Sequence, residues 1–132
     1  MIIAHIAVSV SNINKSAEFY RKHFGFRRTE KFRITSLGLT ISMLKSKSAT
    51  LELFEFKKRR SLPGYRKDLD SDLKTVGVKH FAFAAKNIAH TYNKLKESKV
   101  KFAIDMRTFQ DGSRYFFIKD PDGILVEIME AR

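Results

Sequence analysis

The sequence predicts an α+β fold in which one domain, residues 1–132, contains two tandem modules with the order strand, helix, three strands. Two observations predict this fold: a repeat with an offset of 75 residues, and a hydrophobic period that switches between strand and helix at equivalent places in both copies. Module 1 spans about residues 2–56, a polar linker covers 57–76, and module 2 spans about 77–131. The helices are expected on one face of a mixed sheet.

The repeat carries one histidine and one glutamate in each copy. His5 corresponds to His80, and Glu52 corresponds to Glu127 at the same offset without a gap. The neighbouring matches are Ala7 with Ala82, Asn12 with Asn87, Ile13 with Ile88, and Leu51–Glu55 with Val126–Glu130. This period is too long for a solenoid, so it indicates a duplicated module of about 55 residues.

Module 1 shows its elements by periodicity and turn residues. Residues 2–10 are almost continuously apolar and predict a buried strand. A helix is expected over 14–24, with Asn14 as its N-cap and Gly25 at its end. Three further strands are predicted at residues 26–33, 38–45 and 49–56.

A polar linker separates the two modules, and module 2 repeats the same order. The linker contains the basic block Lys57–Arg60 and is predicted to be a loop with a short helix over 66–74. Module 2 is predicted to contain a strand at 79–85, a helix at 88–98 and strands at 101–106, 114–119 and 124–130. A tight turn at Asp120–Gly123 precedes the last strand.

Strand parity places the repeated polar residues on one side of the sheet. Alternate residues of a strand share a face, so His5 lies with Ala7 and Ser9, opposite the apolar positions that pack under the helix. The same rule places His80, Glu52 and Glu127 on the face without the helix, and small residues beside each histidine leave that face open. Glu55 and Glu130 have the opposite parity and are expected to be solvated or salt-bridged.

The chain has no cysteine, so a metal would have to be held by imidazole and carboxylate groups. We predict that His5, Glu52, His80 and Glu127 converge on one divalent ion, with zinc, nickel, cobalt, manganese and iron(II) as candidates. Two positions left open on such an ion would allow it to polarise a carbonyl group. The alternative is that the histidines are structural and the glutamates lie on exposed edge strands.

The charge is strongly positive, with 26 Lys and Arg against 14 Asp and Glu, a net charge of +12 and a pI near 10.1. Such a pI is typical of nucleic-acid binders, and it also attracts anionic small molecules. The basic residues are spread along the chain, so we expect a solvated surface and no nucleic-acid partner. No signal-peptide pattern and no apolar run of about 20 residues occurs, which predicts a cytoplasmic location and no membrane association.

The motifs together resemble the vicinal oxygen chelate superfamily, which includes glyoxalase I, bleomycin-resistance proteins and extradiol dioxygenases. The matching segments are His5–Val10, Lys15–Tyr20, Leu51–Phe54, Gly77–Phe83 and Asp120–Gly123 followed by Val126–Ile128. The resemblance implies two βαβββ modules curled around a metal cavity, often in a homodimer. It also implies that His5, Glu52, His80 and Glu127 occupy the four ligand positions of the family.

The function implied by the resemblance is that of a metal-dependent lyase or isomerase of glyoxalase type. It would transfer a proton next to a carbonyl of a small, oxygen-chelating substrate, either neutral or anionic, with Glu127 or Glu52 as the proton shuttle. Glutathione-using glyoxalases have an arginine and an asparagine where this chain has Ser9 and Phe56. We therefore do not expect it to act as a glutathione-dependent lactoylglutathione lyase.

Several alternatives remain open from the sequence. Iron(II) held by His5, His80 and Glu127 would support ring-cleaving dioxygenase chemistry, and a non-enzymatic drug-binding protein would need no catalytic ion. Arg107, Arg114 and Lys119 are candidates for an anion clamp or for simple surface charge. Phe54, Phe117 and Met129 are candidates for the pocket lining or the core.

Overall fold

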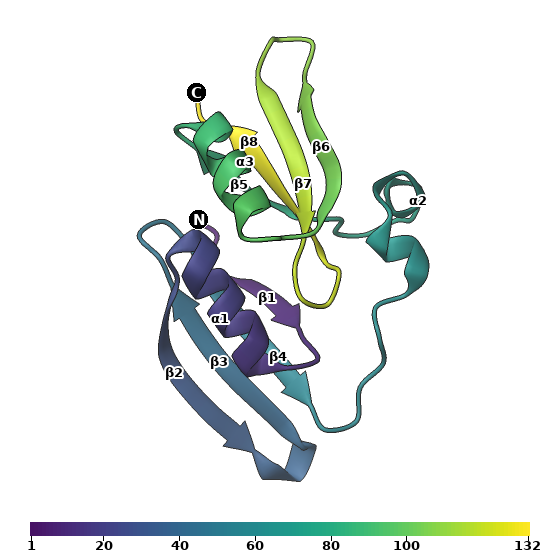
Figure 1. Ribbon diagram of the computed structural model, residues 1–132. Coiled ribbons are helices and arrows are strands. Elements are labelled where there is room, and N and C mark those ends of the chain that lie inside the picture. The colour runs from purple at the N-terminus through teal and green to yellow at the C-terminus, as the bar shows by residue number, and fades with distance from the viewer. The chain divides into compact units, whose positions relative to one another are not determined.

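A computed structural model describes residues 1–132, which divide into two compact units, Met1–Ser61 and Leu62–Arg132 (Figure 1). Unit 1 contains β1 (Ile6–Ser9), α1 (Ile13–Phe24), β2 (Arg27–Ile34), the 3₁₀ turn η1 (Thr35–Leu37), β3 (Leu39–Lys45) and β4 (Thr50–Phe56). Unit 2 contains the 3₁₀ turn η2 (Gly64–Lys67), α2 (Leu69–Leu73), β5 (Phe81–Ala85), α3 (Ile88–Glu97), β6 (Phe102–Thr108), β7 (Arg114–Lys119) and β8 (Leu125–Glu130). The predicted α+β architecture of two βαβββ modules is confirmed.

The sheet of unit 1 has the strand order β1-β4-β3-β2. β1 pairs with β4 in parallel, and the other two pairs are antiparallel, so the sheet is mixed. α1 lies over one face of this sheet and contacts β2, β3 and β4 (Figure 1). Tyr20 from the helix and Leu51 and Leu53 from β4 are completely buried, and they form the centre of the unit 1 core.

α1 begins one residue earlier, and its N-cap lies two residues earlier, than the sequence predicted. Its N-cap is Asn12, whose side-chain oxygen accepts hydrogen bonds from the backbone N–H groups of Asn14 and Lys15 at 3.1 and 2.9 Å. Asn14, the predicted cap, therefore lies inside the first turn, because Asn12 satisfies the unpaired donors there. Gly25 ends the helix with φ of 70°, a left-handed conformation that glycine adopts without steric cost.

The sheet of unit 2 repeats this arrangement with the order β5-β8-β7-β6, including a parallel β5–β8 pair. α3 contacts β8, and its side chain Tyr92 packs edge-on against Phe102 and Phe116 with ring centroids 5.0 and 5.2 Å apart. Phe116, Ile118 and Val126 are completely buried. Each unit therefore has its own core on the helix-covered face of its sheet.

The largest differences from the sequence prediction occur at the edges of elements. The apolar run 2–10 forms a strand only at Ile6–Ser9, because the ladder begins where Ile6 pairs with Leu51. The predicted helix within the linker is two short pieces, η2 and α2, separated by Asp68. None of the helices has the length and apolar character needed to cross a membrane.

Candidate metal-ligand pairs

The first candidate pair lies in unit 1, at the start of the parallel β1–β4 ladder. His5 directly precedes β1, and Ala7, two residues further on, is in register with Glu52 of β4. The Nε2 atom of His5 lies 3.2 Å from Oε2 of Glu52. The side chain of His5 is 45% exposed and that of Glu52 is 20% exposed. Parallel pairing therefore brings together two residues that are 47 positions apart in the sequence.

The second pair lies at the equivalent place in unit 2. His80 directly precedes β5, and Ala82 is in register with Glu127 of β8. His80 Nε2 lies 3.1 Å from Glu127 Oε2, and the edge of the imidazole ring contacts Phe117 with the centroids 4.9 Å apart. At 24% and 12% exposure, both side chains are better shielded than their counterparts in unit 1.

The second histidine has one nitrogen without a partner. His80 Nδ1 is buried and makes no hydrogen bond, whereas Nε2 faces the carboxylate of Glu127. A buried polar atom without a partner costs about 1–3 kcal/mol, so this residue is not arranged for stability alone.

The two pairs have the separation expected of neighbouring ligands on one ion. With metal–nitrogen and metal–oxygen bonds of about 2.0–2.2 Å and angles between 90° and 109°, adjacent ligand atoms lie about 2.8–3.6 Å apart. The observed values of 3.2 and 3.1 Å fall in this range. Within neither unit do three or more His, Asp or Glu side chains gather, so each unit supplies half of the predicted ligand set. The residues present fit a divalent ion of borderline softness.

The face around each pair is open, as strand parity predicted. Ala7 and Ser9 on β1 and Ala82 and Ala84 on β5 are exposed, whereas Val8, which points to the helix side, is buried. Small side chains therefore flank each histidine on the face away from the helix.

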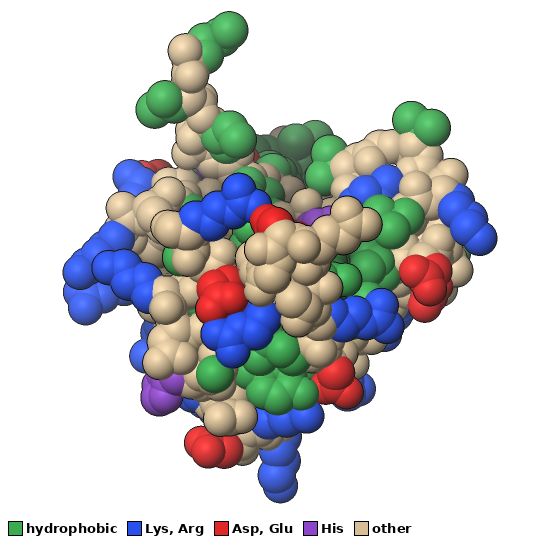
Figure 2. All heavy atoms as spheres, turned by 90° about the horizontal axis from the view of Figure 1, so that it is seen from above, with side chains coloured by type: hydrophobic (Ala, Val, Ile, Leu, Met, Phe, Trp, Pro, Cys, Tyr) green, Lys and Arg blue, Asp and Glu red, His purple; other side chains and the backbone are tan.

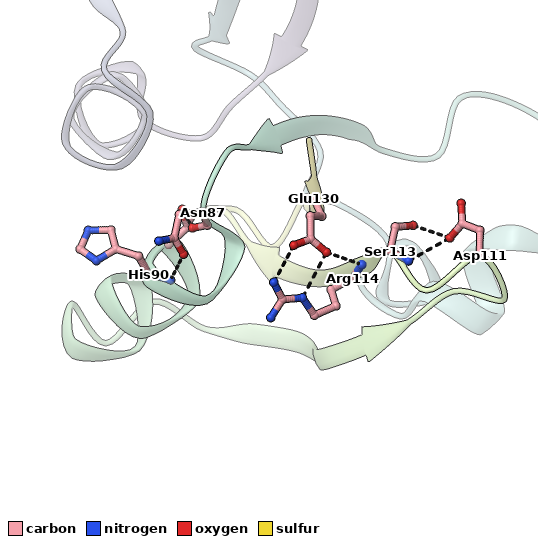
Figure 3. Close-up of polar contacts among 7 residues, drawn as sticks. Asn87, His90, Asp111, Ser113, Arg114 and Glu130 are labelled. Atoms are coloured by element: carbon pink, nitrogen blue, oxygen red, sulfur yellow. Dashed lines mark hydrogen bonds and ion pairs between the residues drawn. The ribbon is translucent and has the colours of Figure 1, made fainter. Parts of the chain in front are cut away.

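Glu55 and Glu130, the two other glutamates of the repeat, lie on the helix-covered face of their sheets. Glu55 is partly exposed, and its Oε2 accepts a hydrogen bond of 2.6 Å from the backbone N–H of Ile13 at the start of α1. Glu130 does form a salt bridge, to Arg114, with Arg114 Nη2 2.5 Å from Glu130 Oε1 (Figure 3). The hydrogen bonds from Arg114 hold the pKa of Glu130 below its usual range. Arg114 is thus engaged with Glu130 on the helix side of the sheet, and its part in an anion clamp stays a prediction.

The remaining histidines and pocket candidates are distributed as follows. His90 is exposed on α3, where its backbone N–H donates to the cap Asn87 (Figure 3), and His23 lies in the last turn of α1. Phe117, 3% exposed, belongs to the core and also contacts the ring of His80. Arg107 is exposed on β6, where it is in register with Tyr115. Arg107 and Lys119 likewise remain candidates for the predicted anion clamp.

Sequence reasoning missed a buried ion cluster in the linker. Asp72 is completely buried and is contacted by Arg66 and Lys79, 3.1 and 3.7 Å from its Oδ1. The run 68–72 appears only as a polar, charged stretch, which predicts an exposed loop. The only sequence signal for this burial is Asp68, a residue type that caps helices. The short helix that begins after it turns Asp72 inward.

The positive charge is unequally divided between the two units. Residues 1–61 contain 13 Lys and Arg against 4 Asp and Glu, a net charge of +9, whereas residues 62–132 contain 13 against 10, a net charge of +3. Basic side chains are spread over the face shown in Figure 2 rather than gathered in one patch. The asymmetry arises because the acidic residues, not the basic ones, are concentrated in unit 2.

Comparisons with known proteins agree with the duplicated fold. A family model for the Glyoxalase/Bleomycin resistance protein/Dioxygenase superfamily matches residues 2–128. YwbC, an uncharacterised protein of Bacillus subtilis (strain 168), is 27% identical over 129 residues, which cover 97% of this chain and 96% of YwbC. The crystal structure of a glyoxalase family protein from Enterococcus faecalis is similar with a TM-score of 0.83 and 25% identity, covering 98% of this chain and 97% of that one.

A more distant likeness extends to an enzyme of the same fold. The trypanothione-dependent glyoxalase I of Leishmania major has a TM-score of 0.75 and 18% identity, over 98% of this chain and 86% of that chain, which shows the fold alone. The family model, in contrast, covers nearly the whole length of the chain. The chain therefore belongs to the glyoxalase/bleomycin resistance protein/dioxygenase superfamily.

Proposed function

We propose that His5, Glu52, His80 and Glu127 bind one divalent metal ion and that the protein is a lyase or isomerase of glyoxalase type. The observation that carries this proposal is the duplicated pair: each unit places a histidine nitrogen and a glutamate oxygen 3.1–3.2 Å apart at equivalent positions. One such pair is a common surface contact. Two pairs in equivalent positions of both modules, each with ligand-like separation, are better explained by a shared role.

The bound ion would polarise a substrate carbonyl and stabilise the negative charge that develops on its oxygen. Glu127 or Glu52 would take the proton from the carbon next to that carbonyl and return it to a neighbouring atom, which isomerises the substrate without any net gain or loss of electrons. Glu127 is the better candidate for the base because its side chain is only 12% exposed. A shielded carboxylate returns most of the protons that it takes to the substrate and exchanges the remainder slowly with water.

Each unit holds only two of the proposed ligands, so a complete site requires both modules. In this proposal the two modules act as one domain, and the pairs are contributed by one chain or by the two chains of a homodimer. Either arrangement predicts one ion per chain. The requirement for both modules also means that the loss of either pair abolishes the site.

The proposed substrate is a small anionic molecule with neighbouring oxygen atoms. The net charge of +9 in residues 1–61 supports an anion, because such a field raises its local concentration. Ser9 and Phe56 provide neither the guanidinium nor the amide group that the resemblance associates with glutathione binding. The substrate is therefore proposed to react without glutathione.

The first test is metal binding by protein that has been stripped with a chelator and dialysed. Titration with Co²⁺, Ni²⁺ and Zn²⁺ should give one ion per chain, and His5→Ala, Glu52→Gln, His80→Ala or Glu127→Gln should each abolish stoichiometric binding. His90→Ala is the matched control, because His90 is exposed on α3 and lies outside the proposed set. Unchanged stoichiometry in the four ligand variants would disprove the site.

The second test addresses the reaction. The metal-loaded protein should exchange solvent deuterium into the carbon next to the carbonyl of small 2-hydroxycarbonyl acids. Proton NMR measures this exchange in the presence and in the absence of glutathione. Glu127→Gln should abolish this exchange. Exchange that occurs only with glutathione would contradict the proposed substrate class. Oxygen-dependent ring cleavage of a catechol by the iron(II) form would favour a dioxygenase instead.

A further inference from the structure

The linker of unit 2 contains a buried ionic cluster close to the second histidine. Asp72 of α2 is completely buried, and its Oδ1 lies 3.1 Å from Arg66 Nε and 3.7 Å from Lys79 Nζ. Its second oxygen, Oδ2, is buried without a hydrogen-bond partner. A buried carboxylate is costly unless it is paired, so these two cations are held close to it.

Arg66 connects this cluster to the backbone that leads into His80. While its Nε donates to Asp72, its Nη2 donates to the carbonyl oxygen of Val78 at 2.6 Å. Lys79 is tied to the end of the short helix as well, because its ammonium group donates to the carbonyl of Thr75. The two residues that directly precede His80 are therefore both anchored to α2 or its C-terminal turn.

The anchored segment has no other regular structure to hold it. Residues 78–80 lie outside any strand, because β5 begins at Phe81. Gly77 has a φ of 131°, a backbone conformation that essentially only glycine adopts, and it permits a turn directly before Val78. The contact between Arg66 and Val78 therefore fixes the backbone directly after Gly77, the residue of this segment with the greatest backbone freedom.

The same segment also supports the strand that carries Glu127. The aliphatic part of Lys67, next to Arg66, lies so close to Gly123 that an added Cβ atom there would be 3.1 Å from Lys67 Cδ. Gly123 belongs to the turn that leads directly into β8 and Glu127. Both members of the second pair thus follow segments that are packed against residues 64–79.

The first pair has no equivalent support. Met1, Ile2 and Ile3, which precede His5, are 129%, 93% and 87% exposed. This difference parallels the shielding of the two histidines, which are 45% exposed for His5 and 24% exposed for His80. The two halves of the proposed ligand set are therefore unequal in how firmly they are held.

We infer that residues 64–79, which we call the brace, hold His80 in its metal-binding position through Asp72 and Arg66. Both are positioning residues, and the inference rests on the proposed function. The His80–Glu127 pair then forms the pre-organised half of the proposed ligand set, to which an ion binds first. Supporting residues around metal ligands commonly set affinity by about 10- to 100-fold.

The experiment compares Arg66→Gln with Arg114→Gln in the full-length chain. Both substitutions remove an arginine that is paired with a carboxylate in unit 2, at side-chain exposures of 36% and 42%, but only Arg66 reaches the segment before His80. Co²⁺ affinity is measured by competition with a chelator. In the metal-free proteins, hydrogen–deuterium exchange is followed at the amides of residues 78–81 and, for reference, of residues 102–108. Arg66→Lys, which keeps the charge but not the forked donors, is the conservative variant.

The inference predicts that Arg66→Gln weakens Co²⁺ binding about 10-fold and speeds exchange at 78–81 but not at 102–108. Arg114→Gln should change neither, and Arg66→Lys should recover part of the affinity. Equal Co²⁺ affinity in Arg66→Gln and the parent protein would overturn the inference while leaving the metal site intact. If the parent protein binds no metal, the proposed function fails, and the brace is judged by exchange: unchanged protection at 78–81 in Arg66→Gln refutes it.

Discussion

Two glutamates on β4 offer a direct test of how the two faces of the sheet divide their roles. Glu52 and Glu55 are three residues apart and have opposite parity. Glu52 faces His5 at 3.2 Å, whereas Glu55 accepts the backbone N–H of Ile13 at 2.6 Å. Changing each of them to alanine should therefore separate metal binding from helix stability.

The magnitude for Glu55→Ala follows from the hydrogen bond that is lost. The variant leaves the Ile13 N–H at the start of α1 without its acceptor, and hydrogen bonds to charged groups contribute about 1.5–3 kcal/mol. α1 has no acidic residue in its first turn that could replace this carboxylate. For 132 residues, 1 kcal/mol corresponds to about 3.6 °C in Tm, so the expected decrease is about 5–11 °C.

Glu52→Ala should have the opposite profile. Its contact with the half-exposed His5 is a surface pair, which contributes about 0–1 kcal/mol, so the Tm should fall by less than about 4 °C. The variant should nevertheless lose the bound ion and the activity. Thermal unfolding of the metal-free proteins by circular dichroism, with Co²⁺ titration of the same samples, measures both quantities. If Glu55→Ala also lost the ion at a temperature where it is folded, or if Glu52→Ala kept it, the assignment of the two faces would be refuted.

Three further predictions concern the framework of the site. Asn12→Ala and Asn87→Ala each remove a helix cap and should each lower the free energy of unfolding by about 1 kcal/mol. Urea denaturation measures this decrease, and the metal stoichiometry should not change. Asp120→Ala should cost about 1–3 kcal/mol, because the 5% exposed carboxylate accepts two backbone N–H groups of its own turn at 2.9 Å, and equal urea midpoints would contradict this. Because hydrogen bonds from Arg114 lower the pKa of Glu130 below 4.5 in the folded state, their stabilisation is present above that pH and is lost as the pH falls through the lowered pKa. The Tm difference between the parent and Arg114→Gln should therefore be present at pH 7 and shrink below pH 4.

The repeat allowed much of the site to be predicted from the sequence. Once His5 and His80 were known to lie on equivalent strands, alternation alone placed Glu52 and Glu127 on the same faces as the histidines. Parallel pairing of the first and last strands of each module then brings each histidine close to its glutamate. These features follow from short-range periodicity, which the sequence contains explicitly.

The features that escaped prediction depend on tertiary partners. Glu55 and Glu130 are equivalent in the repeat, yet one accepts a helix N–H and the other binds Arg114. The difference depends on β7, since Arg114 at its start reaches Glu130. Asp72 was likewise unpredictable, because only the contacts of Arg66 and Lys79 make its burial tolerable. Charge patterning along the chain does not reveal which cation folds back onto which carboxylate.

The divergence of the two copies bears on how a duplicated site can become specialised. A symmetric site built from two identical modules would hold its two pairs equally, but here His80 is the more shielded histidine and follows an anchored segment, whereas His5 follows exposed residues. If the ion binds first to the braced half, the first pair only adds affinity for an ion that is already bound. His80→Ala should then abolish all binding of Co²⁺, whereas His5→Ala should leave weak, rapidly exchanging binding at His80 and Glu127. Equal and complete loss in both variants would mean that the pairs bind the ion as one unit, in spite of their unequal support.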